Sequence, residues 1–289
     1  NSFNKFLELV SVIIVTKNHS KYLKKCLDSV LNQTYKNIEI IIIDHNSSDN
    51  TAEIVFSLKT NKIKYILYKK NKGIADVRNF GVQNSQGEYV FFTDADCIAT
   101  RNWIEEGINF FLKENVAGVE GKTIAENQNF GASEHFVENY LGGQYQTCNM
   151  GYKKRILVEL GMFNEKYKTA YEDVDLALRV KKKYSIKFNP NMLIFHQLVK
   201  WTLWGLITNA LRGRDKVMLV KDHNYHKILK FRILEINSLI VILFPFLLIF
   251  YYRIKSFGDL VIIPFIFIRA ILHRIIIWKA ALANKILIF

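Results

Sequence analysis

Four largely apolar runs in the first hundred residues constrain the fold of this chain more than any other feature. They are Val10–Val15, Ile38–Ile43, Ile63–Leu67 and Tyr89–Phe92. Short apolar runs bounded by polar turns are typical of buried strands. Two of the intervals, at Tyr22–Leu31 and Ala75–Val82, have helical periodicity. Strands that alternate with helices predict an α/β fold with an open, mostly parallel sheet.

Polar side chains stand where three of these predicted strands end. Thr16, Asp44 and Asp94 occupy these positions. Ligands of open α/β sheets bind beyond the carboxyl ends of the strands, so the three side chains are expected to meet there. Their convergence favours a nucleotide pocket over three independent polar groups on the surface.

Asp94 and Asp96 are two carboxylates separated by a single residue, just after an apolar strand. Two carboxylates buried together are costly unless a positive charge neutralises them, and a hard divalent cation carrying diphosphate oxygens supplies that charge. The spacing therefore predicts a metal held for a phosphorylated ligand. Because the motif is short, a strand end with solvated acids is the alternative that these residues alone leave open.

The cationic residues are concentrated near the C-terminus. The 289-residue chain is 50% hydrophobic, enough for a sizeable core, and has a formal net charge of +14. Residues 200–289 contain 14 Lys and Arg but only 4 Asp and Glu, within the most apolar part of the chain. Cations that border apolar runs favour an anionic membrane surface over nucleic acid. The three scattered cysteines predict no disulfide framework and fit a reducing compartment.

The C-terminal third has an amphipathic part and a hydrophobic part. Leu198–Val220 mixes Trp, Leu and Ile with Lys and Arg, which is typical of a helix in the headgroup region or of one packed on a globular domain. Ile233–Tyr252 carries a single charge, and Leu260–Trp278 is also apolar but contains Arg269, His273 and Arg274. A hairpin that crosses the membrane twice and a re-entrant or interfacial pair both stay open.

Five segments, in order and at matching spacing, resemble those of a family 2 glycosyltransferase with the GT-A fold. They are VSVIIVTKN at Val10–Asn18, IIIIDHNSSDNT at Ile40–Thr51, NKGIADVRNFGVQNSQGEYVFFTDADC at Asn71–Cys97, NMGYKKRILVELGMF at Asn149–Phe163 and YEDVDLALRV at Tyr171–Val180. The resemblance implies an α/β GT-A catalytic domain at residues 1–197. We expect a basic interfacial region at 198–232 and hydrophobic membrane helices at 233–289.

The resemblance implies a nucleotide-sugar site at the strand ends. Asp44 matches the carboxylate that accepts a hydrogen bond from the base, usually uracil, and Arg78 matches the basic residue near the diphosphate, with an exposed helix arginine as the alternative. Asp94 and Asp96 match the pair that holds Mn²⁺ or Mg²⁺, and His196 is a further candidate metal ligand or else a satisfied core or surface histidine. The predicted donor-binding residues are Thr16, Asp44, Arg78, Asp94, Ala95 and Asp96.

A second reactive element is the pair Glu172-Asp173. Inverting transfer needs a carboxylate on the sugar face opposite the leaving diphosphate, where it takes the proton of the acceptor hydroxyl. The resemblance implies that Asp173 is this catalytic base, with Glu172 as an orienting group or fallback base. Asn149, Met150 and Gly151 resemble the loop beneath the donor sugar and the acceptor. The loop Lys122–Thr147 is a candidate mobile lid.

These features predict an inverting, metal-dependent hexosyltransferase that is attached to the membrane, with its catalytic domain on the cytoplasmic face. The expected donor is a nucleotide sugar, with UDP favoured, although Val15, Lys17 and His45 depart from the commoner family residues and leave the base less certain. The expected acceptor is a lipid-linked saccharide or other glycan, and no nucleic-acid partner is expected. One alternative is transfer to a bare polyprenyl phosphate. Another, from a different class, is a basic nucleic-acid-binding protein.

Overall fold

The computed structural model describes residues 8–70, 72–224, 229–230, 233–234, 236–245 and 254–286. The chain divides into two compact units. The first comprises Asn1–Glu126, Val137–Lys166 and Glu172–Gln197, and the second comprises Asn127–Phe136, Tyr167–Tyr171 and Leu198–Phe289. Each unit is described by itself below.

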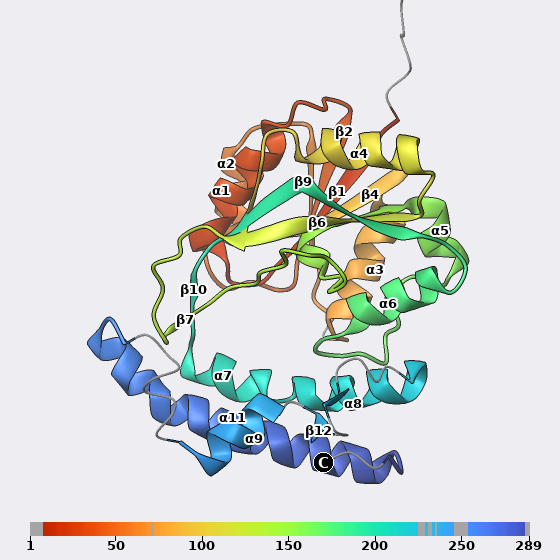
Figure 1. Cartoon of the computed structure of the whole chain (residues 1–289). Coiled ribbons are helices and arrows are strands. Elements are labelled where there is room, and N and C mark those ends of the chain that lie inside the picture. Colours follow the sequence, from red (N-terminus) through yellow and green to blue (C-terminus); the bar gives the residue numbers. More distant parts are fainter. Residues whose placement is uncertain are drawn as a thin grey trace, which may run out of the picture. The chain divides into compact units, whose positions relative to one another are not determined.

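An eight-stranded sheet forms the centre of the first unit, with the strand order β3-β2-β1-β4-β8-β6-β9-β5 (Figure 1). The strands are β1 (Val10–Thr16), β2 (Ile38–Asp44), β3 (Ile63–Leu67), β4 (Tyr89–Asp94), β5 (Cys97–Ala99), β6 (Gly118–Ala125), β8 (Met150–Lys153) and β9 (Ile186–His196). The strands β3, β2, β1 and β4 are parallel, whereas β8 runs antiparallel to both β4 and β6. The predicted α/β sheet is confirmed, and it is mixed.

Helices cover both faces of this sheet, because successive side chains of a strand point to opposite faces. In β1, Val12 and Ile14 pack into one core cluster with α1 (Ser20–Leu31), α2 (Thr51–Ser57) and α4 (Trp103–Glu114). Ile13 packs into a second cluster with α3 (Ile74–Asn84), α5 (Lys154–Glu159) and α6 (Glu172–Lys181). The central strands are therefore buried on both faces, which explains their uninterrupted apolar sequence.

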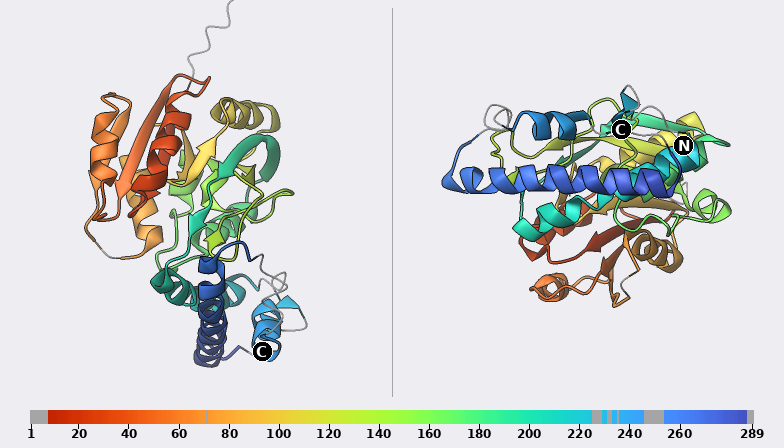
Figure 2. Two further views of the ribbon diagram at one scale, coloured as in Figure 1. Left: turned by 90° about the vertical axis from the view of Figure 1, so that its left-hand side faces the viewer. Right: turned by 90° about the horizontal axis from the view of Figure 1, so that it is seen from below.

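The second unit is mainly helical among its described residues. Its helices are α7 (Leu203–Asn209), α8 (Arg212–His223), α9 (Ile236–Leu243) and α11 (Phe257–Ala283), and its short strands are β7 (Glu134–His135), β10 (Val199–Lys200), β11 (Leu229–Lys230) and β12 (Ile233–Leu234). The amphipathic stretch from Leu198 to Val220 forms β10 and two helices rather than one helix. Figure 2 shows α11 as one long, unbroken helix.

Only part of the predicted hydrophobic segment Ile233–Tyr252 falls within the described residues, where it forms β12 and α9. The second hydrophobic segment lies entirely within α11. Among the described residues, α11 is the one helix that is long and apolar enough to cross a membrane, and the core helix of a soluble protein passes the same test.

Candidate active site

The polar ends of β1, β2 and β4 lie side by side, as the sequence predicts. Thr16 is in register with Asp44 across the parallel pair β1 and β2, and Val15 is in register with Asp94 across β1 and β4. Asp44 is buried and accepts hydrogen bonds from the Tyr65 hydroxyl and the Ser47 amide, both at 2.7 Å. The hydroxyl of Thr16 is also buried, and it has no hydrogen-bond partner among the described residues.

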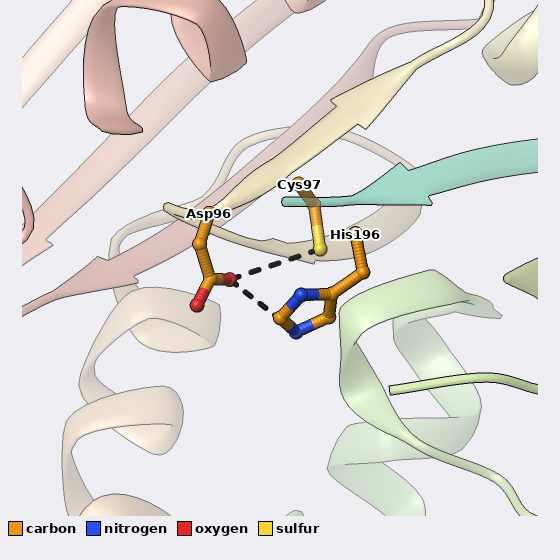
Figure 3. Close-up of side chains that lie close together, drawn as sticks. All are labelled: Asp96, Cys97 and His196. Atoms are coloured by element: carbon orange, nitrogen blue, oxygen red, sulfur yellow. Dashed lines mark hydrogen bonds and ion pairs between the residues drawn. The ribbon is translucent and has the colours of Figure 1, made fainter. Parts of the chain in front are cut away.

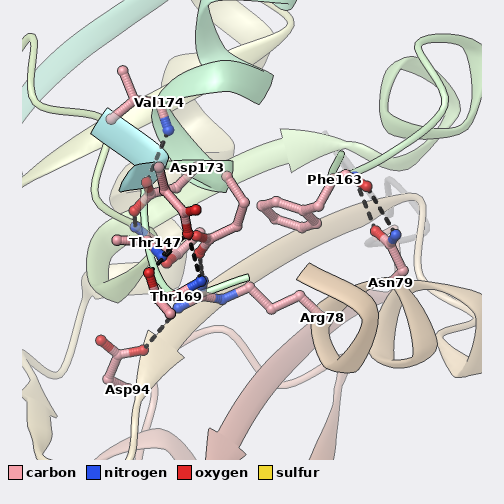
Figure 4. A network of polar contacts seen from close by, with 11 residues as sticks. Arg78, Asn79, Asp94, Thr147, Phe163, Thr169, Asp173 and Val174 are labelled. Atoms are coloured by element: carbon pink, nitrogen blue, oxygen red, sulfur yellow. Dashed lines mark hydrogen bonds and ion pairs between the residues drawn. The ribbon is translucent and has the colours of Figure 1, made fainter. Parts of the chain in front are cut away.

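Arg78 projects from α3 into the centre of the site and connects two acids. Its side chain is only 10% exposed, so the alternative of an exposed helix arginine is wrong. One guanidinium nitrogen, Nη1, contacts Oε1 of Glu172, and the other, Nη2, lies 3.7 Å from Oδ1 of Asp94 (Figure 4). A buried guanidinium with two carboxylates is a site where diphosphate oxygens can compete for the same donors.

Asp94 lies in a cluster of acids that is incompletely neutralised. Desolvation raises the pKa of Asp94 above its ordinary value, the Arg78 charge opposes this shift, and the charges of Asp96 and Asp173 add to it. Burial is the main cause of this shift, so holding the Asp94 carboxylate ionised here, with Asp96 and Asp173 nearby, has an electrostatic cost. An additional positive charge would lower that cost, which is consistent with a bound cation.

Asp96, Cys97 and His196 offer three candidate metal-ligating atoms that lie within 4.8 Å of one another (Figure 3). Oδ1 of Asp96 is 3.7 Å from Nε2 of His196 and 3.9 Å from Sγ of Cys97. The grouping arises because Cys97 begins β5 opposite His196, which ends β9. All three residues are buried.

The orientation of His196 suits a metal ligand. Its Nδ1 lies 2.8 Å from the carbonyl oxygen of Gln197, and since a carbonyl can only accept, Nδ1 carries the proton. In the neutral ring this leaves the lone pair of Nε2 directed toward Asp96. Oxygen, nitrogen and sulfur donors at this separation fit one small divalent ion. Asp94 is not one of these three donors, because its carboxylate faces Arg78. Cys97 is not among the site residues that the sequence predicts. Its position directly after the two aspartates is the one sequence feature that points to it.

Glu172 and Asp173 begin α6 and have different environments. Glu172 is 2% exposed and is held by Arg78. Asp173 is half-buried, and its two oxygens accept from the Thr147 amide at 3.3 Å and from its own neighbour Val174 at 2.8 Å (Figure 4). Further along the helix, Asp175 pairs with Arg179 at 2.8 Å, a structural ion pair. Asp173 is therefore the more exposed acid of the pair.

Glu172→Ala should destabilise the protein by about 3 to 5 kcal/mol, because it leaves the buried Arg78 guanidinium without its closest counter-charge. Thermal unfolding measured by circular dichroism checks this prediction. The matched control is Glu159→Ala, which removes a half-exposed partner of Lys183 and should cost less than about 1 kcal/mol. Equal unfolding temperatures for the two variants would show that the pair has no structural role.

The predicted acceptor residues Asn149, Met150 and Gly151 lie within the buried part of the first unit. The Asn149 amide donates to the carbonyls of Lys122 and Met192 and accepts from the Trp103 indole at 2.8 Å, so its hydrogen-bonding capacity serves the core. Met150 is fully buried in β8, and a side chain at position 151 would meet aromatic rings of the core. In this structure the side chains of Asn149 and Met150 are therefore committed to the core. Ala95 is likewise buried, with its methyl group in the core.

Part of the candidate lid, Lys122–Thr147, continues a strand, and another part is held by one buried acid. Residues 122–125 continue strand β6, and Glu120 of the same strand accepts hydrogen bonds from the Asn139 side chain and from the amides of residues 143, 144 and 145, at 2.6 to 2.9 Å. This carboxylate holds the turn at 139–145 in place. Leu141, at the tip of the turn, is 90% exposed. No periodic pattern marks Glu120 in the sequence, because its partners are mostly backbone amides.

The mixed sheet with helices on both faces is the GT-A fold of glycosyltransferases. The sequence model of glycosyl transferase family 2 matches residues 11–184, and the chain belongs to this family. The glycosyltransferase GlyG of Streptococcus pneumoniae is 42% identical over 141 residues, covering 47% of this chain and 45% of GlyG. An uncharacterized glycosyltransferase of Rickettsia typhi is 31% identical over 248 residues, covering 75% of this chain and 76% of that protein.

Solved structures share the fold at low sequence identity. Residues 1–349 of TarS from S. aureus in complex with UDP-GlcNAc give a TM-score of 0.58 at 18% identity, over 73% of this chain and 66% of that one. GalNAc-T7 with UDP, GalNAc and Mn²⁺ gives 0.60 at 16% identity, over 75% and 48%. The chain spans less than half the length of the first curated relatives that it matches.

Proposed function

We propose that this chain transfers a sugar from a UDP-sugar to a saccharide acceptor held at a membrane, with inversion at the anomeric carbon. The observation that carries the proposal is the grouping of Arg78, Asp96 and Asp173 around Asp94 at the end of β4, with Asp44 at the end of β2 and β1 between the two strands. The binding of UDP by TarS and by GalNAc-T7, which share the fold, supports the choice of nucleotide.

The donor would lie along the strand ends. Asp44, which is held by Tyr65 and Ser47, would accept a hydrogen bond from the base. The Thr16 hydroxyl, which has no hydrogen-bond partner among the described residues, offers a further polar contact. Arg78 would exchange part of its contact with Asp94 for a diphosphate oxygen. The exchange costs little, because a guanidinium 3.7 Å from Oδ1 of Asp94 forms only a loose ion pair with it.

Asp96 and His196 would hold a divalent ion, with Asp94 close by and Cys97 as an additional donor. Such an ion, when bound, neutralises charge on the leaving diphosphate. The imidazole nitrogen favours Mn²⁺ over Mg²⁺. Mg²⁺ demands near-ideal octahedral geometry and is usually bound by carboxylates, waters and phosphate oxygens, so a site with a nitrogen ligand suits it less well.

His196→Gln should weaken Mn²⁺ binding by at least about 10-fold, because even outer-sphere partners of a metal are commonly worth 10- to 100-fold in affinity. Electron paramagnetic resonance of free Mn²⁺ in the presence of UDP measures this affinity. His19→Gln, outside the metal-ligating group, is the control and should leave the affinity unchanged. Equal affinities for the two variants would remove His196 from the ion site.

Asp173 would act as the base, since it is the more exposed acid of the pair and is electrostatically coupled to Asp94 at the site. Its carboxylate would take the proton of the acceptor hydroxyl while the diphosphate departs on the opposite face of the sugar. The fixed ion pair with Arg78 leaves Glu172 a positioning role.

The acceptor is proposed to be a lipid-linked saccharide rather than a bare polyprenyl phosphate. The exposed Tyr140 and Leu141 on the turn fastened by Glu120 offer an aromatic and an apolar surface of the kind that packs against sugar rings. The apolar helix α11 in the second unit supports membrane attachment, with the catalytic unit proposed to face the cytoplasm.

A panel of nucleotide sugars, titrated by calorimetry with Mn²⁺ and again with chelator, tests the donor assignment. We expect a UDP-sugar to bind in the presence of Mn²⁺ and to bind much more weakly with chelator. Binding of RNA in place of every nucleotide sugar would favour the alternative class of a nucleic-acid-binding protein.

A further inference from the structure

Among the described residues, helix α11 has one apolar face that the second unit covers and a second apolar face that stays exposed. The covered face includes Ile262, Ile266, Ala270, Ile277 and Ala280, each less than 9% exposed. The other face carries large apolar side chains that are 40 to 81% exposed: Phe257, Val261, Ile268, Ile275, Trp278 and Leu282. These six residues, here called the outer stripe, follow one another at intervals of three, four or seven residues. Side chains at these intervals lie along one side of a helix.

The covered face fastens α11 to α7 and α8 along much of its length. Val217 and Val220 of α8 pack in one cluster with Ile277, Ala280 and Ala281. The His273 ring lies 2.9 Å from the carbonyl oxygen of Ala210. Two further contacts follow the same side: Arg269 donates to Asn209 at 3.2 Å, and Lys221 donates to Asn284 at 3.0 Å. The helix is therefore built into the unit and does not stand alone.

The sequence of α8 prevents this assembly from crossing a bilayer. The helix Arg212–His223 reads RGRDKVMLVKDH and carries six charged side chains in twelve residues. Charged side chains at the bilayer centre are costly, so α8 cannot enter the hydrocarbon core with α11. Because α8 packs on the C-terminal half of α11, that half cannot span either while the packing is maintained. A helix lying in the membrane plane keeps both its packing and its exposed apolar face.

Charges near the helix favour an anionic lipid surface as the occupant. A cavity of about 430 Å³ within the second unit has Lys168, Arg214 and Lys279 around an apolar floor that includes Leu211 and Ile276. Lipid phosphates are attracted to such a cationic rim, and acyl chains suit the floor. In a coiled-coil pair with a second copy, charged residues commonly flank the apolar seam. Here the half-exposed Leu260 and the partly exposed Leu272 flank the outer stripe, so its flanks are partly apolar.

We propose that α11 lies in the plane of an anionic membrane, with the outer stripe inserted at the boundary between headgroups and acyl chains and with Lys168, Arg214 and Lys279 close to the lipid phosphates. The surface is a monotopic attachment site, and the apolar sequence of α11 serves a helix that does not cross the bilayer. The proposal does not depend on the transfer reaction, because none of these residues belongs to the candidate active site.

Binding of the full chain to vesicles tests the surface. The variant Ile268→Glu/Ile275→Glu should bind vesicles of phosphatidylcholine and phosphatidylglycerol at least about 10-fold more weakly than the unchanged chain, because two apolar anchors are replaced by charges. The control Phe56→Glu/Leu112→Glu adds the same charges at exposed apolar positions of the first unit and should bind normally. Equal binding by both variants would overturn the proposal. Thermal unfolding of both variants verifies that they are folded.

Depth measurements separate the in-plane helix from its rivals. Spin labels attached singly at positions 257, 268 and 282 of the full chain should all report a similar, shallow depth in the vesicles. A depth that is greatest at 268, with 257 and 282 near opposite surfaces, would show a spanning helix and overturn the proposal. Labels that stay outside lipid but broaden one another's spectra would show that a second copy covers the stripe, and would overturn it equally.

Discussion

Asp173→Asn should lower the rate of sugar transfer by about 10²- to 10⁴-fold while the affinity for the nucleotide sugar hardly changes. Asparagine keeps the volume of the side chain and can still accept from the Thr147 amide, but it cannot take a proton from the acceptor. Single-turnover rates and calorimetric titration of the donor measure the two quantities separately.

Glu172→Gln provides the comparison within the same pair. Glutamine can still accept from the Arg78 guanidinium but loses its charge, so this variant should show a lower unfolding temperature together with a smaller loss of rate than Asp173→Asn. A larger loss of rate in Glu172→Gln, with its stability retained, would reverse the assignment and make Glu172 the base.

Asp96→Ala should abolish the part of donor binding that depends on Mn²⁺. Asp96 is the one acid among the three candidate metal-ligating side chains, with Oδ1 within 4 Å of both His196 and Cys97. Removing this carboxylate should cost the fold little, because it relieves repulsion with Asp94. Titration of the donor with and without chelator, alongside thermal unfolding, tests both parts of the prediction.

The control for this variant is Asp28→Ala, which removes an exposed acid paired with Lys24 on α1. It should bind the donor as the unchanged chain does, with the same dependence on Mn²⁺. If Asp96→Ala also retains that dependence, Asp96 does not hold the ion, and the proposed metal site is contradicted.

The sheet could be predicted from the sequence because its central strands are buried on both faces. β3 has the same bounds as the predicted strand, and β1 and β2 each extend one residue further, to Thr16 and Asp44. A strand that helices cover on both faces has apolar side chains throughout, and the apolar run ends where the chain reaches the edge of the sheet at the carboxyl ends of the strands. The same reasoning predicts Thr16, Asp44 and Asp94 at one edge of the sheet, and the register of β1 with β2 and β4 agrees with it.

The local sequence could not distinguish polar groups that serve the core from those that face a ligand. Asn149 has the residue type expected for a substrate contact, yet its amide joins β6, β9 and α4 through three buried hydrogen bonds. Glu120 has no sequence neighbour that reveals its role, because residues 139–145 reach it through the tertiary fold. Such roles depend on long-range contacts that periodicity does not encode.

Hydropathy was also insufficient for the C-terminal helices. The apolar segment Leu260–Trp278 is long enough to cross a bilayer, but the structure shows that its basic residues are buried or bonded within the second unit. Arg274 is 1% exposed, and His273 faces Ala210 of the adjoining segment. A helix whose charges are accommodated by polar neighbours has a different membrane position from an isolated helix of the same composition.

Transfer of labelled sugar from the UDP-sugar that binds best to a lipid extract, with the full chain and Mn²⁺, tests the central claim most directly. We predict that the label becomes extractable into organic solvent, that UDP is released in equal amount, and that Asp173→Asn reduces both by at least about 100-fold. If the label stays on the nucleotide with every UDP-sugar and every lipid fraction tried, or if Asp173→Asn transfers it as fast as the unchanged chain, the proposed reaction and its base are contradicted.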